Sequence, residues 1–150
     1  MYRAARALFL AISVSAVMAA AIVSTVGAAP AIPLNAGQEA DVVNGGGSGS
    51  FSYTIDGDEL CYTLSVKGLS MAPFAAHIHY PGPRGVAGPV VVPLATPPAA
   101  TSTVSGCITA AEGGAMTPAE LATIVADPRA HYVNVHTTNY PGGEVRGQLK

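Results

Sequence analysis

Two of the four histidines in the sequence stand one residue apart, in the segment AAHIHYPGPRGVAGPVVVPL at residues 75–94. If this segment begins as a strand, His77 and His79 project from the same face of the sheet, because side chains alternate between its two faces. A Pro- and Gly-rich loop follows the pair, and an apolar stretch follows the loop. Such a pair can serve as metal ligands, as a ligand-binding site or as a structural clamp on the loop.

A second segment, HYVNVHT at residues 131–137, can supply partners for this pair. Alternation places Asn134 and His136 on one face, opposite the two valines. If the two segments are neighbouring strands, three imidazoles converge on a surface outside the core. Three imidazoles suit copper or zinc, and Asn134 or Arg146 could add polar contacts.

The same residues also have a structural interpretation. A histidine beside a Pro- and Gly-rich loop can hydrogen-bond main-chain carbonyls and fix the path of the loop. Asn134 and Arg146 can likewise be a buried amide and a buried guanidinium that tie strand ends to the loop backbone. His131 has the wrong parity relative to His136, and we expect it to be a strand-edge residue. Both interpretations stay open at the level of the sequence.

Motifs for catalysis are missing. Glu120 and Glu144 are isolated carboxylates, the first expected to cap a helix and the second to lie on the surface, so no paired acid and base is evident. The sequence contains no nucleophile elbow, no phosphate-binding Gly-Lys loop and no His-Glu-x-x-His zinc motif. These observations favour a protein that is not an enzyme.

The elements that would position these residues are short strands. Apolar and polar residues alternate on both sides of Asp56-Gly57, which predicts a β-hairpin within residues 47–69. Further strands are predicted at residues 75–79, 89–94, 132–136 and 143–149, after a short tail at 31–33. Thr117 and Glu120 form a capping-box pattern around Pro118 and predict one helix. We expect an all-β fold, a single antiparallel β-sandwich or small Greek-key barrel, superoxide-dismutase-like or immunoglobulin-like, with one short helical insertion.

Two cysteines, Cys61 and Cys107, fall on the face opposite the alternating apolar residues of their strands. In an exported chain they meet an oxidising compartment, where a disulfide between them is the economical interpretation. Two separate buried thiols are the alternative.

The first residues have the layout of a secretory signal peptide at residues 1–28, with cleavage after Ala28 and a domain at 29–150. A retained membrane anchor is the alternative. Without Arg3 and Arg6, five basic residues remain against nine acidic ones, so no basic patch for nucleic acid is expected. We therefore expect a secreted protein with no stable membrane insertion after cleavage.

The blocks AHIHYPGPRGVAGPVVVPL and HYVNVHTTNYPGGEVRGQL resemble the CHRD domain, which is named for the secreted protein chordin and is also found singly in exported microbial proteins. The resemblance covers residues 31–150 and includes the Gly68-Leu69 pair. In chordin the domain belongs to an extracellular antagonist of bone morphogenetic proteins. This chain is a solitary domain without cysteine-rich modules, so we do not expect it to share that activity.

The His-x-His strand, the Gly/Pro-rich loop and the late Val-x-Val-His strand also look like the copper-ligand layout of copper/zinc superoxide dismutases. By that resemblance His77, His79 and His136 would be copper ligands, and Arg146 would attract an anion. No histidine between Tyr80 and Ala130 can act as a bridging ligand, so the resemblance implies at most a mononuclear copper site.

Three functions remain open. The first is a secreted, non-catalytic module with a binding or structural role, in which His77, His79, Asn134, His136 and Arg146 form a polar network. The second is an extracellular copper-binding protein that uses the three histidines. The third is an envelope or matrix adhesion module. The partner would be an extracellular protein or a glycan.

Overall fold

The computed structural model describes residues 30–150, so the predicted signal peptide and its cleavage point lie outside the described residues. Strands and short helices follow one another through the described chain. They are β1 (Ile32–Asn35), η1 (Ala36–Gln38), β2 (Ser48–Asp56), β3 (Glu59–Lys67), β4 (Ala75–His79), β5 (Val90–Leu94), β6 (Ser102–Thr109), α1 (Pro118–Ala126), η2 (Pro128–Ala130), β7 (Tyr132–Thr137) and β8 (Tyr140–Gln148). Among residues 30–150, no helix combines the length and the apolar character needed to cross a membrane.

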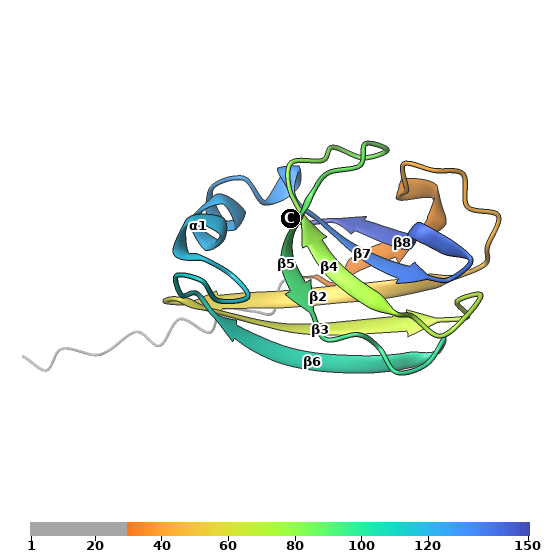
Figure 1. Ribbon diagram of the computed structural model, residues 1–150, viewed down its shortest axis with the longest axis horizontal. Coiled ribbons are helices and arrows are strands. Elements are labelled where there is room, and N and C mark those ends of the chain that lie inside the picture. The colour runs from red at the N-terminus through yellow and green to blue at the C-terminus, as the bar shows by residue number, and fades with distance from the viewer. Residues whose placement is uncertain (1–29) are drawn as a thin grey trace, which may run out of the picture.

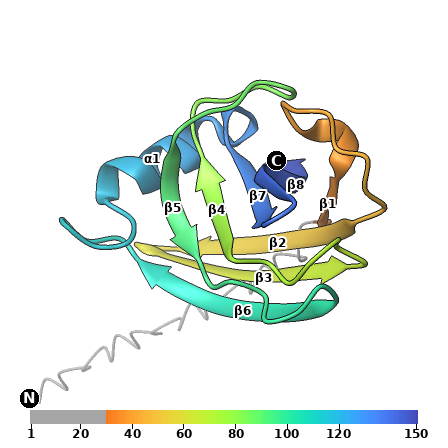
Figure 2. The same ribbon diagram turned by 45° about the vertical axis from the view of Figure 1, so that its right-hand side comes forward.

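The eight strands form one antiparallel sheet in the order β5-β4-β7-β8-β1-β2-β3-β6. The sheet curls into a nearly closed barrel, in which β4, β5, β7 and β8 lie over β2, β3 and β6 (Figures 1 and 2). Strands β5 and β6 are the two edges. The prediction of an all-β fold with one short helix is confirmed, in the form of a barrel made from a single sheet.

Alternation along the strands builds the core. The strand β3 has every second residue buried, from Leu60 to Val66, and its remaining residues are more exposed. The same rule buries Phe51 on β2 and Ile78 on β4. Inward side chains from both layers of the barrel therefore fill one apolar core, and the outward side chains are left for other roles.

The hairpin of β2 and β3 runs from the pair Ser48↔Lys67 to the pair Asp56↔Glu59. The turn is Gly57-Asp58, one residue later than predicted, and Gly57 has a φ of 58°. A two-residue hairpin loop favours this left-handed conformation, which glycine adopts without steric cost.

The prediction of a tail at residues 31–33 is wrong, because β1 lies there and pairs with both β2 and β8. Its burial pattern explains the difference, since Ile32 and Leu34 point into the core and alternate with exposed residues. This strand joins the two layers of the barrel (Figure 2).

The helix α1 begins as its sequence predicts. The Thr117 hydroxyl accepts a hydrogen bond from the Glu120 main-chain N–H at 3.2 Å, and the Glu120 carboxylate accepts one from the Thr117 N–H at 2.7 Å. This capping box satisfies two main-chain donors that the first turn would otherwise leave free. The helix buries Leu121 and Ile124 against the barrel.

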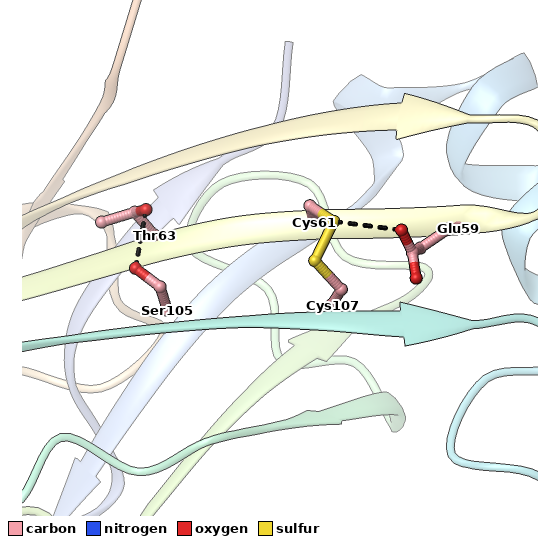
Figure 3. Close-up of a disulfide and its surroundings, with 5 residues drawn as sticks. All are labelled: Glu59, Cys61, Thr63, Ser105 and Cys107. Carbon is pink, nitrogen blue, oxygen red and sulfur yellow. Dashed lines mark hydrogen bonds between the residues drawn. A yellow bond between two sulfur atoms is a disulfide. The ribbon is translucent and has the colours of Figure 1, made fainter.

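The predicted disulfide is present. Cys61 and Cys107 are directly opposite residues of β3 and β6, and their sulfur atoms are 2.02 Å apart. The bridge lies on the outer face of the sheet, beside a hydrogen bond of 2.9 Å between Thr63 and Ser105 (Figure 3). It joins residues 46 positions apart in the sequence, and the chain between them contains β4 and β5.

Candidate metal centre

The strand register brings the two histidine segments together. Strand β4 lies between β5 and β7, and its pairing with β7 sets Ala75 opposite His136 and His77 opposite Asn134. In an antiparallel pair, directly opposite residues project from the same face. His77, His79 and His136 therefore share the outer face of the barrel, away from the core.

The three imidazole rings form one cluster, in which one nitrogen from each ring lies within 4.8 Å of the others. His77 Nδ1 is 3.2 Å from His136 Nε2. His79 completes the group, with its ring centroid 5.6 Å from that of His77 and 5.7 Å from that of His136. Three imidazole nitrogens at this spacing can turn toward a single ion between them.

Main-chain carbonyls orient two of the three rings. His79 Nδ1 lies 2.9 Å from the carbonyl oxygen of Gly88, and His136 Nδ1 lies 2.9 Å from that of Pro141. Because a carbonyl oxygen only accepts, each Nδ1 must carry the proton, and in a neutral ring Nε2 then keeps its lone pair. His136 Nε2 faces His77, whereas His79 Nε2 is buried without a hydrogen-bond partner.

The surroundings keep these rings neutral. Burial lowers the pKa of His79 to about 4, and the neighbouring His136 and His77 add a smaller repulsion. Burial also lowers the pKa of His136, and burial followed by repulsion from His136 lowers that of His77. The neutral imidazole is the form that binds metal ions.

Tyr132 packs against the histidine cluster through His79. Its ring stacks on His79 with the centroids 4.7 Å apart and the planes at 7°, and the Arg146 guanidinium lies 3.3 Å from the Tyr132 ring centroid. The Tyr132 hydroxyl accepts a hydrogen bond of 2.9 Å from the Gly88 N–H. The residue whose carbonyl orients His79 is therefore itself held by Tyr132.

Arg146 is fully buried and binds the loop between β4 and β5. Its guanidinium donates to the carbonyl oxygens of Gly82 at 2.7 Å, Pro83 at 2.8 Å and Val86 at 2.8 Å. The Arg146 guanidinium thus fixes the irregular main chain of residues 82–86, which leads directly to Gly88.

Asn134 was expected to bind the main chain of the loop after His79, but its side chain bonds a carboxylate from another segment. Its Nδ2 donates to the Glu39 carboxylate at 2.8 Å, so it contacts the segment after η1 and not the loop between β4 and β5. Burial raises the pKa of Glu39 to about 7, against the opposing charge of Arg146. Glu39 is a residue that sequence analysis missed, because 95 positions separate it from Asn134.

The prediction that Glu144 lies on the surface is wrong, since its side chain is fully buried. Its carboxylate accepts hydrogen bonds of 2.6 Å from the Ser70 N–H, the Ser70 hydroxyl and the Thr137 hydroxyl. Three donors offset the loss of water around the charge. Glu144 fastens the chain before β4 to the β7–β8 hairpin.

The prediction that His131 is a strand-edge residue is also wrong. The ring is fully buried and stacks on Tyr80 at a centroid distance of 4.2 Å. Its Nδ1 donates to the Asp127 carbonyl at 2.8 Å, and Nε2 lies 3.2 Å from the Thr123 hydroxyl. His131 therefore ties β7 to the end of α1 and stands apart from the other three histidines.

Comparison with known protein families extends this description. The model of the CHRD domain matches residues 31–149, which include both histidine segments and all eight strands. No curated protein and no solved structure matches the chain. Because the family model covers more than half of the sequence, the chain belongs to the CHRD domain family.

Proposed function

We propose that this CHRD-domain protein is an extracellular module that binds one copper ion through His77, His79 and His136. Two observations carry the proposal: each of the three imidazoles offers a nitrogen within 4.8 Å of the other two, and His79 Nε2 is buried without a hydrogen-bond partner. A buried polar atom without a hydrogen bond is costly, and a bound ion would satisfy it.

The surroundings of the cluster support a metal site. Metal-binding histidines usually donate their second N–H to a carbonyl or carboxylate, which fixes the tautomer and the ring plane. His79 and His136 have that arrangement through Gly88 and Pro141. Imidazole ligands suit both copper and zinc, and among divalent first-row ions copper binds such ligands most tightly.

The role that we propose is binding and not catalysis. The three rings would hold the ion, and Arg146 and Tyr132 would keep the loop and His79 in place. The Cys61–Cys107 disulfide supports a location outside the cytoplasm, because such bonds persist in oxidising compartments.

A second candidate function is a structural network without metal. It is favoured by the 3.2 Å contact between His77 Nδ1 and His136 Nε2, which can be an ordinary hydrogen bond. In this case the histidines serve only to hold the two loops, and the module acts through another part of its surface.

Asparagine substitutions separate the two functions. The Asn side-chain amide can take the place of histidine Nδ1 and keep the bond to a carbonyl, but it has no equivalent of Nε2. His79→Asn and His136→Asn should therefore retain the loop contacts and lose a ligand. His131→Asn is the matched control, because its Nδ1 also bonds a carbonyl and it lies outside the cluster.

The experiment is a calorimetric titration of the purified protein with copper(II) and, separately, with zinc(II). We expect one copper per chain, with an affinity that falls by about 100-fold or more in His79→Asn and His136→Asn and is unchanged in His131→Asn. Electron paramagnetic resonance of the copper(II) complex should show coupling to imidazole nitrogens. The proposal would be contradicted if copper did not bind, or if it bound equally to all four proteins. Tighter binding of zinc than of copper would show that the three histidines form a zinc site and not a copper site.

A further inference from the structure

A second polar site lies outside the metal centre, where β1 and the end of β8 meet the loop between β4 and β5. It is a pocket of about 330 Å³. Its polar lining consists of Gln38, Arg84, Arg129, Gln148 and Lys150. The volume falls within the range of about 300–1,000 Å³ that small-molecule sites occupy.

The charge of the pocket differs from that of the chain. Residues 30–150 contain nine acidic and five basic side chains, yet three of these five basic residues line this pocket. No aspartate or glutamate side chain is among the described lining residues. A fourth cation, Arg146, donates to the Gln148 side-chain oxygen at 3.2 Å and so lies directly behind the pocket wall.

One wall of the pocket is fixed before any ligand arrives. Gln38 is only 4% exposed, and its side-chain N–H donates to the Pro33 carbonyl at 3.0 Å. Its side-chain oxygen accepts a hydrogen bond of 3.2 Å from Arg84. A buried amide therefore positions the Arg84 guanidinium, although Arg84 itself is exposed.

The opposite wall is fixed in a similar way. The Gln148 side-chain N–H donates to the carbonyl oxygens of Gly82 and Arg129, both at 2.8 Å. This contact sets the main chain of Arg129, whose side chain is exposed. The two arginines thus extend from anchored positions and not from mobile loops.

A guanidinium donates two parallel hydrogen bonds to the planar edge of a carboxylate, or to a sulfate. The pocket also has buried apolar residues at its base, Ile32 and Leu149. We propose that this pocket binds an oxyanion carried by a body about as large as one sugar ring, namely a carboxylated or sulfated sugar unit. Arg84 and Arg129 would bind the oxyanion, and Lys150 would contribute at the rim.

The test is a titration of the purified protein with three trisaccharides of matched length: one of uronic acids, one sulfated and one neutral. Sodium sulfate serves as the fourth probe. Arg84→Gln combined with Arg129→Gln removes two charges and keeps polar side chains. Lys67→Gln is the matched control, because Lys67 is exposed on β3 and is the one described basic residue outside the pocket and its wall.

We expect binding of the uronic acid or the sulfated trisaccharide, whichever carries the preferred oxyanion, with an affinity that decreases as salt increases. The dissociation constant should rise by about 10-fold or more in the double arginine variant and stay unchanged in Lys67→Gln. Thermal unfolding of each variant checks that it is folded.

Several outcomes would overturn the proposal. Equal binding of the neutral trisaccharide would show that charge is not recognised, and binding of free sulfate alone would exclude the sugar. No binding of any probe, or an equal loss in Lys67→Gln, would also overturn it. The metal titration is independent, because none of its ligands lines this pocket.

Discussion

The outer face of the barrel has two halves that handle polar side chains in opposite ways. On β2, β3 and β6 many outward residues are small hydroxyls, and two pairs of them bond each other, Thr63 with Ser105 at 2.9 Å and Ser65 with Thr103 at 2.8 Å. On β4, β7 and β8 the outward residues are imidazole, amide, carboxylate and guanidinium groups, and loops cover them.

The difference shows where ligand chemistry can arise. Polar groups that face water need no protein partner, whereas covered groups must find one. Four buried side-chain atoms in the described chain have none: Glu39 Oε1, His79 Nε2, Asn134 Oδ1 and Arg146 Nε. Three of these atoms lie on β4, β7 and β8, and the fourth belongs to Glu39, which contacts Asn134 on β7. Unsatisfied polar atoms therefore arise where polar side chains are covered, and not simply where they are abundant.

The largest change in stability should come from removing the Cys61–Cys107 disulfide, which joins β3 and β6 in the half of the barrel that carries the hydroxyl pairs. Replacing both Cys61 and Cys107 by serine should lower the free energy of unfolding by about 4 kcal/mol, because the open chain regains the entropy of a long loop. Urea denaturation of the two proteins measures the difference. An unchanged midpoint would mean that the hydrogen bonds between β3 and β6 suffice alone.

Within the covered half, Arg146→Ala should lower the free energy of unfolding by about 3 kcal/mol, because it strands the carbonyl oxygens that the guanidinium binds. Lys67→Ala, on the other half, should change it by less than about 0.5 kcal/mol. Chemical denaturation measures the free energy of unfolding of both variants. Similar losses in the two would contradict the idea that buried polar contacts on β4, β7 and β8 stabilise the fold more than exposed residues on β3 do.

The covered half should also respond to pH through Glu39. Its pKa of about 7 in the folded protein exceeds its ordinary value of 4.5, so the folded state binds the proton more tightly. The stability that this group contributes is therefore present below pH 4.5 and is lost as pH rises through 7. The loss should be about 2 kcal/mol, because the carboxyl is only half-buried.

Glu39→Gln, which resembles the protonated acid, should remove this dependence. Denaturation midpoints of both proteins at pH 4.5 and pH 8 test it. The variant should match the wild-type protein at the lower pH and be more stable at the higher pH. The opposite order would show that Arg146 stabilises the ionised carboxylate.

The smallest effect should come from the hydroxyl pairs. Thr63→Val should change the free energy of unfolding by less than about 0.5 kcal/mol, because the freed Ser105 hydroxyl can bind water. Thermal unfolding measures this value. A loss as large as that of Arg146→Ala would place hydroxyl pairing among the main stabilising contacts of the sheet.

The sequence predicted features that depend on local pattern. Alternation identified β2, β3 and β4, the capping box located α1, and parity set both cysteines on the outer face. These rules need only neighbouring residues. The short strand β1 was missed because Pro33 lies inside it and only Ile32 and Leu34 mark its buried face.

The candidate site was less predictable, because it depends on contacts between distant segments. Parity placed the three clustered histidines on one face. The burial of Glu144 and the pairing of Asn134 with Glu39 depend on how loops return over the sheet, which no local period encodes. Parity set His131 apart from the other three histidines, but its contacts with Thr123 and Asp127 at the end of the predicted helix were not expected.

The carbonyl groups that orient His79 and His136 belong to the main chain, and this affects how equivalent sites can be found in other sequences. An amide carbonyl is present whatever side chain a residue carries, so position 141 is free to vary while the acceptor persists. Position 88 is not, because a Cβ there would come within 2.2 Å of the Pro81 carbonyl oxygen. The diagnostic pattern is therefore sparse: His-x-His, a glycine nine residues later, and a distant Val-x-Val-His. Homologues that keep these positions, with Tyr132 and Arg146 to hold the loop, can preserve the geometry while the other side chains of the loop diverge.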